Sequence, residues 1–351
     1  MKTPFTSLLI AWNKQKNTRQ MPWKGEKDPY LIWLSEIILQ QTRVEQGLPY
    51  FLRFKQKYPT VKHLALAPED DVMKLWQGLG YYSRARNLHE TAKNIHHNLG
   101  GKFPDRFDEL VKLKGVGAYT AAAIASFAFG EPKAVVDGNV IRVLARVFGI
   151  STAFDTTAGK KEFAALAQQL IDSKQPAAYN QAIMDFGAVV CTPQNPACEA
   201  CPMYKICVAY TTNKTAELPK REKRTKILPR YFNYLVIKSK TEILIEKRTG
   251  NDIWKNLYQL PLIETAQPLK KDFHKAIAAH LGTDAFTIDS YGREVSQMLS
   301  HRKIYFRFVV LETDNINRLK INGLQKVKLN KLHEYAFPKT INDYLNSNVL
   351  K

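Results

Sequence analysis

Apolar residues in the N-terminal part of the chain recur at helical spacing. Over residues 5–210, apolar stripes alternate with short Gly, Pro and Asp signals, and strict alternation is rare. Asp28-Pro29 is typical of a helix start, because it places a capping residue before a proline at the first helical position. Beyond the helix that begins there, the pattern predicts helices over 68–76, 84–99, 105–113, 119–129, 140–148, 158–172 and 179–190.

The pattern changes after residue 210. Residues 211–229 contain prolines and a basic run without an apolar period, which indicates a linker. Beyond them, β-branched and aromatic residues predict strands over 231–238, 242–247 and 303–311, with one helix over 271–281. The sequence therefore predicts a mainly α domain over 1–210, a basic linker over 211–229 and an α+β domain over 230–351.

The charge balance indicates an anionic partner. The chain has 52 basic and 32 acidic residues, a formal net charge of +20. Residues 227–351 hold 20 of these basic and 12 of these acidic residues, so both halves share the excess. Such a balance favours DNA, RNA or an anionic membrane surface.

No apolar run approaches the roughly 18 to 20 residues of a membrane span, and the first residues do not match a signal peptide. We therefore expect a cytoplasmic monomer, associated with the nucleoid if the source is bacterial.

All four cysteines of the chain lie in one loop, as Cys191, Cys198, Cys201 and Cys207. Disulfides are out of place in a reducing compartment, so four clustered thiolates predict a metal site. Zinc usually takes short-spaced pairs from separate knuckles, whereas gaps of six, two and five residues in one loop suit a 4Fe-4S cluster. Four unrelated buried thiols are the third alternative.

Gly115 and Gly117 form a Gly-x-Gly turn between two predicted helices. Glycines let backbone amides approach a phosphate closely, and the helix that follows adds its dipole. Taken alone, these residues are more typical of an ordinary helix–helix turn.

Two acidic residues stand out from their surroundings. Glu36 lies in a helical stretch that is apolar on most of its circumference, so burial should raise the pKa of its carboxyl and suit it to act as a general acid. A buried glutamate satisfied by hydrogen bonds is the structural alternative. Asp137 precedes a predicted helix, where it can cap the helix and present a free carboxylate oxygen to a cleft.

Taken together, these segments resemble the helix-hairpin-helix DNA glycosylases, and within them the MutY-type adenine DNA glycosylases. The matching motifs occur in the family's order at 19–23, 33–36, 40–44, 78–88, 113–120, 137–139 and 191–207. The resemblance implies a helix-hairpin-helix glycosylase fold with a 4Fe-4S cluster loop. It also implies a monofunctional enzyme of base excision repair, which flips adenine out of double-stranded DNA when it is mispaired with 8-oxoguanine or guanine.

The resemblance also implies roles for individual residues. Glu36 would protonate adenine N7, Asp137 would stabilise the oxocarbenium ion, and Tyr119 and Asn139 would order the site. The adenine pocket would consist of Met21, Trp23, Leu39, Val44 and Gln181. DNA contacts would come from Gln41, Thr42, Leu79, Tyr81, Gly115 and Gly117. Taken alone, the apolar members Met21, Leu39, Val44 and Leu79 are typical of a core.

The C-terminal domain resembles the family's Nudix-like module, on the match at 254–261. Residues 273–282 contain no acidic residue, so the metal-binding glutamates of Nudix hydrolases are missing. Leu299, Ser300 and His301 match the loop that reads 8-oxoguanine, with leucine in place of the usual phenylalanine.

Two alternatives are open at this point. A bifunctional lyase similar to endonuclease III would need a lysine where this chain has Tyr119. A non-catalytic iron–sulfur protein that only binds DNA would not need Glu36 in an apolar helix.

Overall fold

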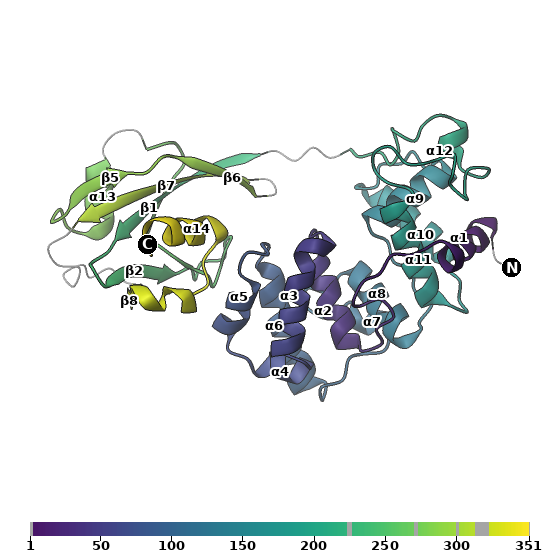
Figure 1. Cartoon of the computed structure of the whole chain (residues 1–351), viewed down its shortest axis with the longest axis horizontal. Coiled ribbons are helices and arrows are strands. Elements are labelled where there is room, and N and C mark those ends of the chain that lie inside the picture. The colour runs from purple at the N-terminus through teal and green to yellow at the C-terminus, as the bar shows by residue number, and fades with distance from the viewer. Residues whose placement is uncertain (1–2, 223–226, 270–272, 300–301, 313–322, 351) are drawn as a thin grey trace. The chain divides into compact units, whose positions relative to one another are not determined.

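The computed structural model describes residues 3–222, 227–269, 273–299, 302–312 and 323–350. The chain forms two compact units, one of residues 1–66 and 87–224 and one of residues 67–86 and 225–351. The first is helical and the second contains all the described strands (Figure 1). The grouping of residues 67–86 with the C-terminal part depends on tertiary contacts, which the spacing of apolar residues does not indicate.

Helices account for almost all regular structure before residue 222. Most of the predicted helices are present to within a few residues, but the one expected over 105–113 is a single turn, Phe107–Leu110. The helices are α1 (Pro4–Gln15), α2 (Pro29–Leu39), α3 (Val44–Lys57), α4 (Val61–Leu66), α5 (Glu69–Trp76), α6 (Ser83–Asn98), α7 (Phe107–Leu110), α8 (Ala118–Phe129), α9 (Gly138–Phe148), α10 (Thr157–Leu170), α11 (Pro176–Val189) and α12 (Val208–Thr211).

Helix α2 is an internal helix of the first unit. Asp28 caps it by accepting a hydrogen bond from the Tyr30 N–H at 2.8 Å, as the Asp-Pro pair predicts. Every residue over 30–38 is buried, and α2 packs against α3 and α8. Polar groups on α2 are therefore removed from water.

An apolar core joins α1, α8, α9, α10 and α11, with Phe5, Val143, Phe163 and Phe186 among its members.

Much of the segment predicted to be a linker packs on the first unit. Leu218 is buried in the same core, and its carbonyl accepts a hydrogen bond from Arg146 Nε at 3.1 Å. The Lys220 carbonyl accepts one from the Phe154 N–H, and the Glu222 N–H donates to Asp155. The chain is thus held in place by specific contacts as far as Glu222.

The second unit is an α+β fold built on two sheets. One sheet has the order β4-β1-β7-β5, with β6 also pairing with β7, and the other has the order β3-β2-β8. Its elements are β1 (Leu228–Ile237), β2 (Glu242–Lys247), β3 (Tyr258–Gln259), β4 (Leu262–Thr265), α13 (Phe273–Leu281), β5 (Thr287–Tyr291), β6 (Val295–Leu299), β7 (Arg302–Glu312), β8 (Leu324–Lys328), the 3-10 helix η2 (Leu329–Glu334) and α14 (Lys339–Asn348).

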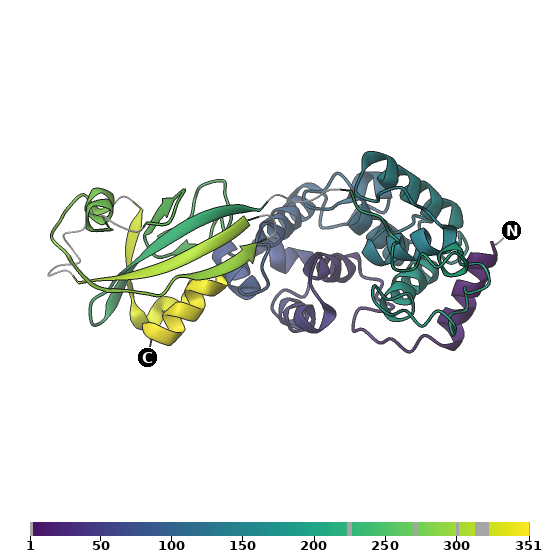
Figure 2. The same ribbon diagram turned by 90° about the horizontal axis from the view of Figure 1, so that it is seen from above.

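The two helices of this unit bury different residues. Ile341 and Leu345 of α14 join an apolar cluster with alternate residues of β1 and β7, and α14 lies along these long strands (Figure 2). Phe273 and Ile277 of α13 pack in a separate cluster with the remaining apolar residues of the same strands. The sequence predicted β1, β2, β7 and α13 but missed the shorter strands and α14.

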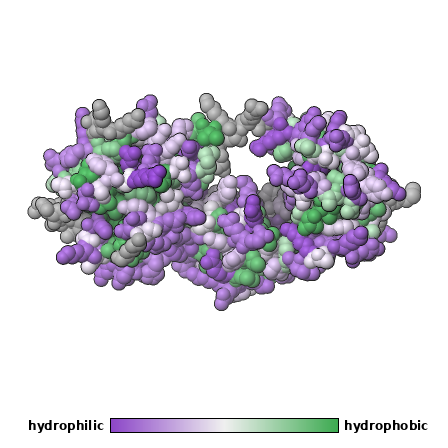
Figure 3. Space-filling view, turned by 45° about the horizontal axis from the view of Figure 1, so that its top comes forward, coloured by the Kyte–Doolittle hydropathy of each residue, from purple (hydrophilic) through white to green (hydrophobic). Residues whose placement is uncertain are grey.

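Apolar side chains are mostly inside. The visible surface in Figure 3 is largely hydrophilic, with small scattered apolar patches. Of the helices in the described part of the chain, none combines the length and apolar character needed to cross a membrane.

Candidate active site

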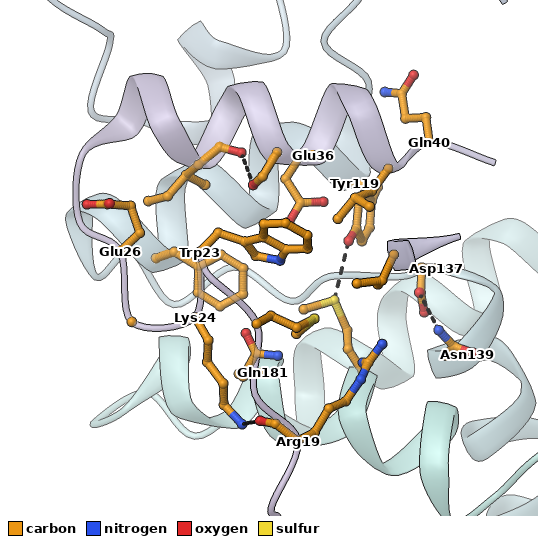
Figure 4. Close-up of a pocket in the computed structure, with 18 of the residues that line it drawn as sticks. Arg19, Trp23, Lys24, Glu26, Glu36, Gln40, Tyr119, Asp137, Asn139 and Gln181 are labelled. Carbon is orange, nitrogen blue, oxygen red and sulfur yellow. Dashed lines mark hydrogen bonds between the residues drawn. The ribbon is translucent and has the colours of Figure 1, made fainter. Parts of the chain in front are cut away.

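A cavity of about 830 Å³ lies in the first unit. Its walls come from the loop before α2, the C-terminal end of α2, the start of α3, and from α8, α9 and α11 (Figure 4). The cavity brings together residues that the sequence analysis predicted from distant segments: Met21, Trp23, Glu36, Leu39, Gln41, Thr42, Val44, Tyr119, Asp137, Asn139 and Gln181.

Glu36 lies on α2 between the apolar interior and the cavity (Figure 4). It is 8% exposed, and its pKa is raised to about 7. Burial is the main cause, the negative charge of Asp137 adds to it, and a hydrogen bond with Tyr119 opposes it. Glu36 therefore holds a proton up to neutral pH, as its apolar helix predicts.

Tyr119 stands beside Glu36 at the start of α8. Its hydroxyl donates to Met184 Sδ at 3.3 Å, as drawn in Figure 4, and also interacts with Glu36. Burial raises the pKa of Tyr119 well above its ordinary value, with the nearby carboxyl groups adding to the effect. The phenol therefore stays protonated and is a hydrogen-bond donor in the cavity.

Asp137 caps α9, as its sequence position predicts, and also lines the cavity, although neither of its carboxylate oxygens is free. As the N-cap of α9 it accepts a hydrogen bond from the Val140 N–H at 2.7 Å, and its other oxygen accepts one from Asn139 Nδ2 at 3.0 Å. Burial raises the pKa of Asp137, whereas these donors and the Arg142 charge oppose the rise. The donors favour an ionised carboxylate here, in contrast to the apolar surroundings of Glu36.

Arg142 connects the segment that carries Asp137 and Asn139 with the loop that carries the cysteines. Its Nη2 donates to Asn139 Oδ1 at 2.9 Å and to the Gly187 carbonyl at 2.6 Å. Its Nε donates to the Cys191 carbonyl at 2.7 Å. The position of Asn139 is thus tied to that of a cysteine distant in sequence.

Asp185 was missed by the sequence analysis. Its side chain is fully buried on α11 and accepts hydrogen bonds from Arg19 at 2.8 Å, from Gln181 at 3.1 Å and from Lys24 at 3.1 Å. It therefore fixes the loop that carries Met21 and Trp23. The available signal was the same as for Glu36, namely an acidic residue inside an apolar helical stretch.

Several residues expected to contact DNA do not line this cavity. Tyr81 is 46% exposed and adopts a positive φ of 46°, so it protrudes from a tight turn. Leu79 in the same turn is only 5% exposed, and a contact between its side chain and DNA would require this turn to open. Leu299 ends β6 and is half-buried. Ser300 and His301 lie outside the described residues.

Gly115 and Gly117 lie in the turn between α7 and α8, with both backbones exposed. Gly115 has φ +75°, and a Cβ atom there would come within 2.7 Å of Asn87 Cβ. Glycine is thus required at this position for conformational and steric reasons. The observed hairpin leaves room for a phosphate approach, and its function stays a prediction.

The four cysteines face one small cavity. Among the described residues, no three His, Cys, Asp or Glu side chains are grouped tightly enough to hold a single metal ion. The Met203 N–H donates to Cys201 Sγ at 3.4 Å, and Arg146 Nη1 donates to Cys191 Sγ at 3.5 Å. Donors of this kind stabilise thiolates, and the four cysteines that line this cavity are the residues that would hold an iron–sulfur group there.

Three family models match the chain. The model of the HhH-GPD superfamily base excision DNA repair proteins matches residues 34–172, and that of the NUDIX domain matches residues 233–347. The iron-sulfur binding domain of endonuclease III matches residues 191–207. This last match decides between zinc and iron: the cofactor is a 4Fe-4S cluster, and the four cysteines are the residues that would hold it.

Curated relatives cover most of the chain. The adenine DNA glycosylase of Buchnera aphidicola (subspecies Schizaphis graminum) is 37% identical over 272 residues, which are 76% of this chain and 78% of the relative. The human adenine DNA glycosylase is 44% identical over 216 residues, which are 59% of this chain but 39% of the human protein.

Solved structures match the helical part. A thermostable thymine-DNA glycosylase superposes with a TM-score of 0.55 at 32% identity, covering 59% of this chain and 95% of that one. Endonuclease III in a non-covalent DNA complex superposes with a TM-score of 0.52 at 24% identity, covering 61% and 99%, which supports the shared fold.

The buried carboxyl makes a prediction for stability. Because folding raises the Glu36 pKa from 4.5 to about 7, its contribution to stability is full below pH 4.5 and is lost as the pH rises through 7. Replacing Glu36 by the neutral Gln should therefore stabilise the protein at pH 8.5 by on the order of 3 kcal/mol, with little effect at pH 5.

Thermal unfolding midpoints of the holoprotein at the two pH values measure this difference. Glu109→Gln, the same substitution at an exposed position of α7, is measured alongside as the control. Equal shifts for Glu36→Gln at both pH values would contradict the raised pKa.

Proposed function

The chain belongs to the adenine DNA glycosylase family, and we propose that it excises adenine mispaired with 8-oxoguanine or guanine by base flipping and acid-assisted hydrolysis. The observation that carries the proposal is that the buried Glu36, whose pKa burial raises to about 7, and Asp137 line one cavity. We expect a monofunctional enzyme that acts as a monomer on double-stranded DNA in the cytoplasm.

Entry of the base into the cavity requires flipping, since the glycosidic bond is out of reach inside stacked DNA. We assign the flipped adenine to the part of the cavity formed by Met21, Trp23, Leu39, Val44 and Gln181. The apolar groups would cover the faces of the base, and the Gln181 amide would bond to its polar edge. Asp185 orients this amide by accepting a hydrogen bond from it.

Glu36 would supply the proton for bond cleavage. Transfer of its proton to adenine N7 would turn the base into a neutral leaving group as the bond between C1′ and N9 breaks. Tyr119 would hold the carboxyl in position. Asp137, whose N–H donors favour its ionised form against the effect of burial, would stabilise the oxocarbenium ion until water attacks C1′ and gives up a proton to a carboxylate or to solvent.

We expect exposed residues of both units to contact duplex DNA. Tyr81 and Gln41 are exposed and both have positive φ, so they are suited to insert where the adenine leaves the stack. We expect Thr42 to contact the DNA beside them, and the amides of the Gly115–Gly117 turn to contact the phosphate backbone.

A lyase reaction would need a free amine near C1′. Two lysines line the cavity, Lys24 and Lys27. Lys24 is held by Asp185 and by the Arg19 carbonyl, and Lys27 donates to the Phe127 carbonyl at 3.0 Å. These contacts, together with Tyr119 in place of lysine, favour the monofunctional reaction.

We assign recognition of the opposite base to Leu299, which ends β6, and to the two residues that follow it in the sequence. A serine hydroxyl and a histidine, Ser300 and His301, can distinguish the C8 oxygen and N7 proton of 8-oxoguanine from guanine. Leu299 packs against the core of the second unit and offers no aromatic face. We expect Leu299→Ala to reduce discrimination less than Ser300→Ala combined with His301→Ala.

Glu36→Gln should abolish excision while leaving DNA affinity nearly intact, because the amide keeps the shape but cannot donate the proton. Asp137→Asn should lower the rate by about 100-fold or more through lost charge stabilisation. The single-turnover rate of the native enzyme should fall as the pH rises above about 7, since the protonated Glu36 is the active form. Near-native excision by either variant would refute the role given to that carboxyl.

Strand cleavage of three duplexes separates the alternatives. Duplexes with adenine opposite 8-oxoguanine or opposite guanine should break only after alkali, the first faster, and a thymine glycol duplex should stay intact. Borohydride should trap little covalent adduct. Abundant trapping would favour a lyase that uses a lysine such as Lys24, and failure to release adenine from any duplex would favour a non-catalytic protein.

A further inference from the structure

A buried carboxylate stands behind the wall of the cavity in the first unit. The side chain of Asp185 is fully buried, and each of its two oxygens accepts two hydrogen bonds. Oδ1 accepts from Arg19 at 2.8 Å and from Gln181 at 3.1 Å, and Oδ2 accepts from Asn17 at 2.8 Å and from Lys24 at 3.1 Å. Four such bonds use the full accepting capacity of a carboxylate. Three of the four donors line the cavity, whereas Asp185 itself does not.

This arrangement fixes which end of the Gln181 amide faces Asp185. A carboxylate accepts hydrogen bonds and cannot donate one, so only the NH2 group of the amide can bond to it. Gln181 Nε2 makes this bond at 3.1 Å. If the amide turned over, its oxygen would face Asp185 Oδ1, and two acceptors would meet without a proton between them. The amide therefore has one favourable orientation.

The oxygen of the same amide is available to a ligand. Gln181 projects from α11 into the cavity (Figure 4). None of the described residues donates a hydrogen bond to its Oε1. The cavity thus presents a fixed hydrogen-bond acceptor to the polar edge of a base that enters it.

Purine bases differ in what they offer to such an acceptor. Adenine carries an amino group at C6, which donates hydrogen bonds, whereas guanine and hypoxanthine carry a carbonyl oxygen there, which only accepts them. A C6 carbonyl group that faced the fixed Gln181 oxygen would bring two acceptors together after both had left water. A fixed amide therefore favours adenine, and an amide that is free to turn over would suit either kind of base.

We propose that Asp185 is a positioning residue that selects adenine over purines with a carbonyl group at C6, because it holds the Gln181 oxygen toward the base. This inference rests on the proposed function, in which the flipped base binds beside Gln181. Asp185 does not touch the base, since its side chain is fully buried. It acts by removing the second orientation of the amide, which would otherwise accept the wrong base.

A purely structural role for the same carboxylate leads to a different expectation. Asp185 forms ion pairs with Arg19 and Lys24, and it could serve only as the counter-charge that holds the loop with Met21 and Trp23. Its removal would then slow the excision of every base by the same factor. Selection through the amide instead predicts that the rates for the two kinds of base change in opposite directions.

The test uses Asp185→Asn in the full-length holoenzyme. Asparagine keeps the shape but can both donate to Gln181 and accept from it, so both orientations of the amide become possible. Single-turnover excision is measured on duplexes with adenine or hypoxanthine opposite guanine. We expect the preference for adenine to fall by about tenfold, the value of one good polar contact, with a faster rate on hypoxanthine than the native enzyme shows. A loss of structure cannot produce this gain.

Two further variants test the route through Gln181. Gln181→Met should also lower the preference, and adding Asp185→Asn to it should lower it no further, because the amide through which Asp185 acts is gone. Asn17→Ala is the matched control. Asn17 donates to Asp185 Oδ2 and accepts from the Arg19 N–H at 3.1 Å, so its loss loosens the same loop without freeing the amide, and the native preference should remain.

The possible results separate the role of Asp185 from the proposed function. A native preference in Asp185→Asn or in Gln181→Met would overturn the role of Asp185. So would a fall that comes only from slower release of adenine, an equal loss on both bases, additive effects in the double variant, or the same change of preference in Asn17→Ala. Failure of the unmodified enzyme to release adenine from any duplex would instead refute the proposed function.

Discussion

The burial of one carboxyl group in helix α2 is the constraint on which the site depends. Because each residue over 30–38 is buried, the Glu36 carboxyl has little contact with water, and this burial raises its pKa to about 7 and favours the neutral acid. The same burial reduces stability at higher pH, which an amide at this position would avoid. A chain under pressure for stability alone would not keep a glutamate there, whereas acid catalysis at neutral pH requires one.

The rest of the site is held around α2 by polar contacts from α11 and α9. Asp185 fixes the loop that carries Trp23, and the Gly187 carbonyl accepts a hydrogen bond from Arg142. A Cβ atom at Gly187 would come within 2.7 Å of Asn139 Cβ, so a small residue on α11 permits the close approach of the segment that carries Asn139. Arg142 also reaches the Cys191 carbonyl. The loop that carries the cysteines and the segment that carries Asp137 and Asn139 are therefore held together by Arg142.

The sequence predicts those features that depend on local spacing. The cysteine loop, the cap at Asp137 and the burial of Glu36 follow from residues close together in the chain, and the structure and comparisons agree with them. The Asp185 network and the grouping of residues 67–86 with the C-terminal part depend on tertiary contacts, which no local pattern specifies. The burial of Leu79 agrees with the core position that its apolar side chain alone predicts. The exposed strands β5 and β6 were missed because each has five residues, in which apolar and polar positions do not alternate. The roles of the individual site residues stay predictions.

The central claim is that Glu36 is a proton donor because the fold keeps it neutral. The most direct measurement is an NMR titration of the holoprotein with carbon-13 in the glutamate side chains, in which the Glu36 signal is assigned by its loss in Glu36→Gln. The account predicts a midpoint of about 7 for this carboxyl. A midpoint near the ordinary glutamate value of 4.5 would show an ionised carboxylate at neutral pH and would contradict the account.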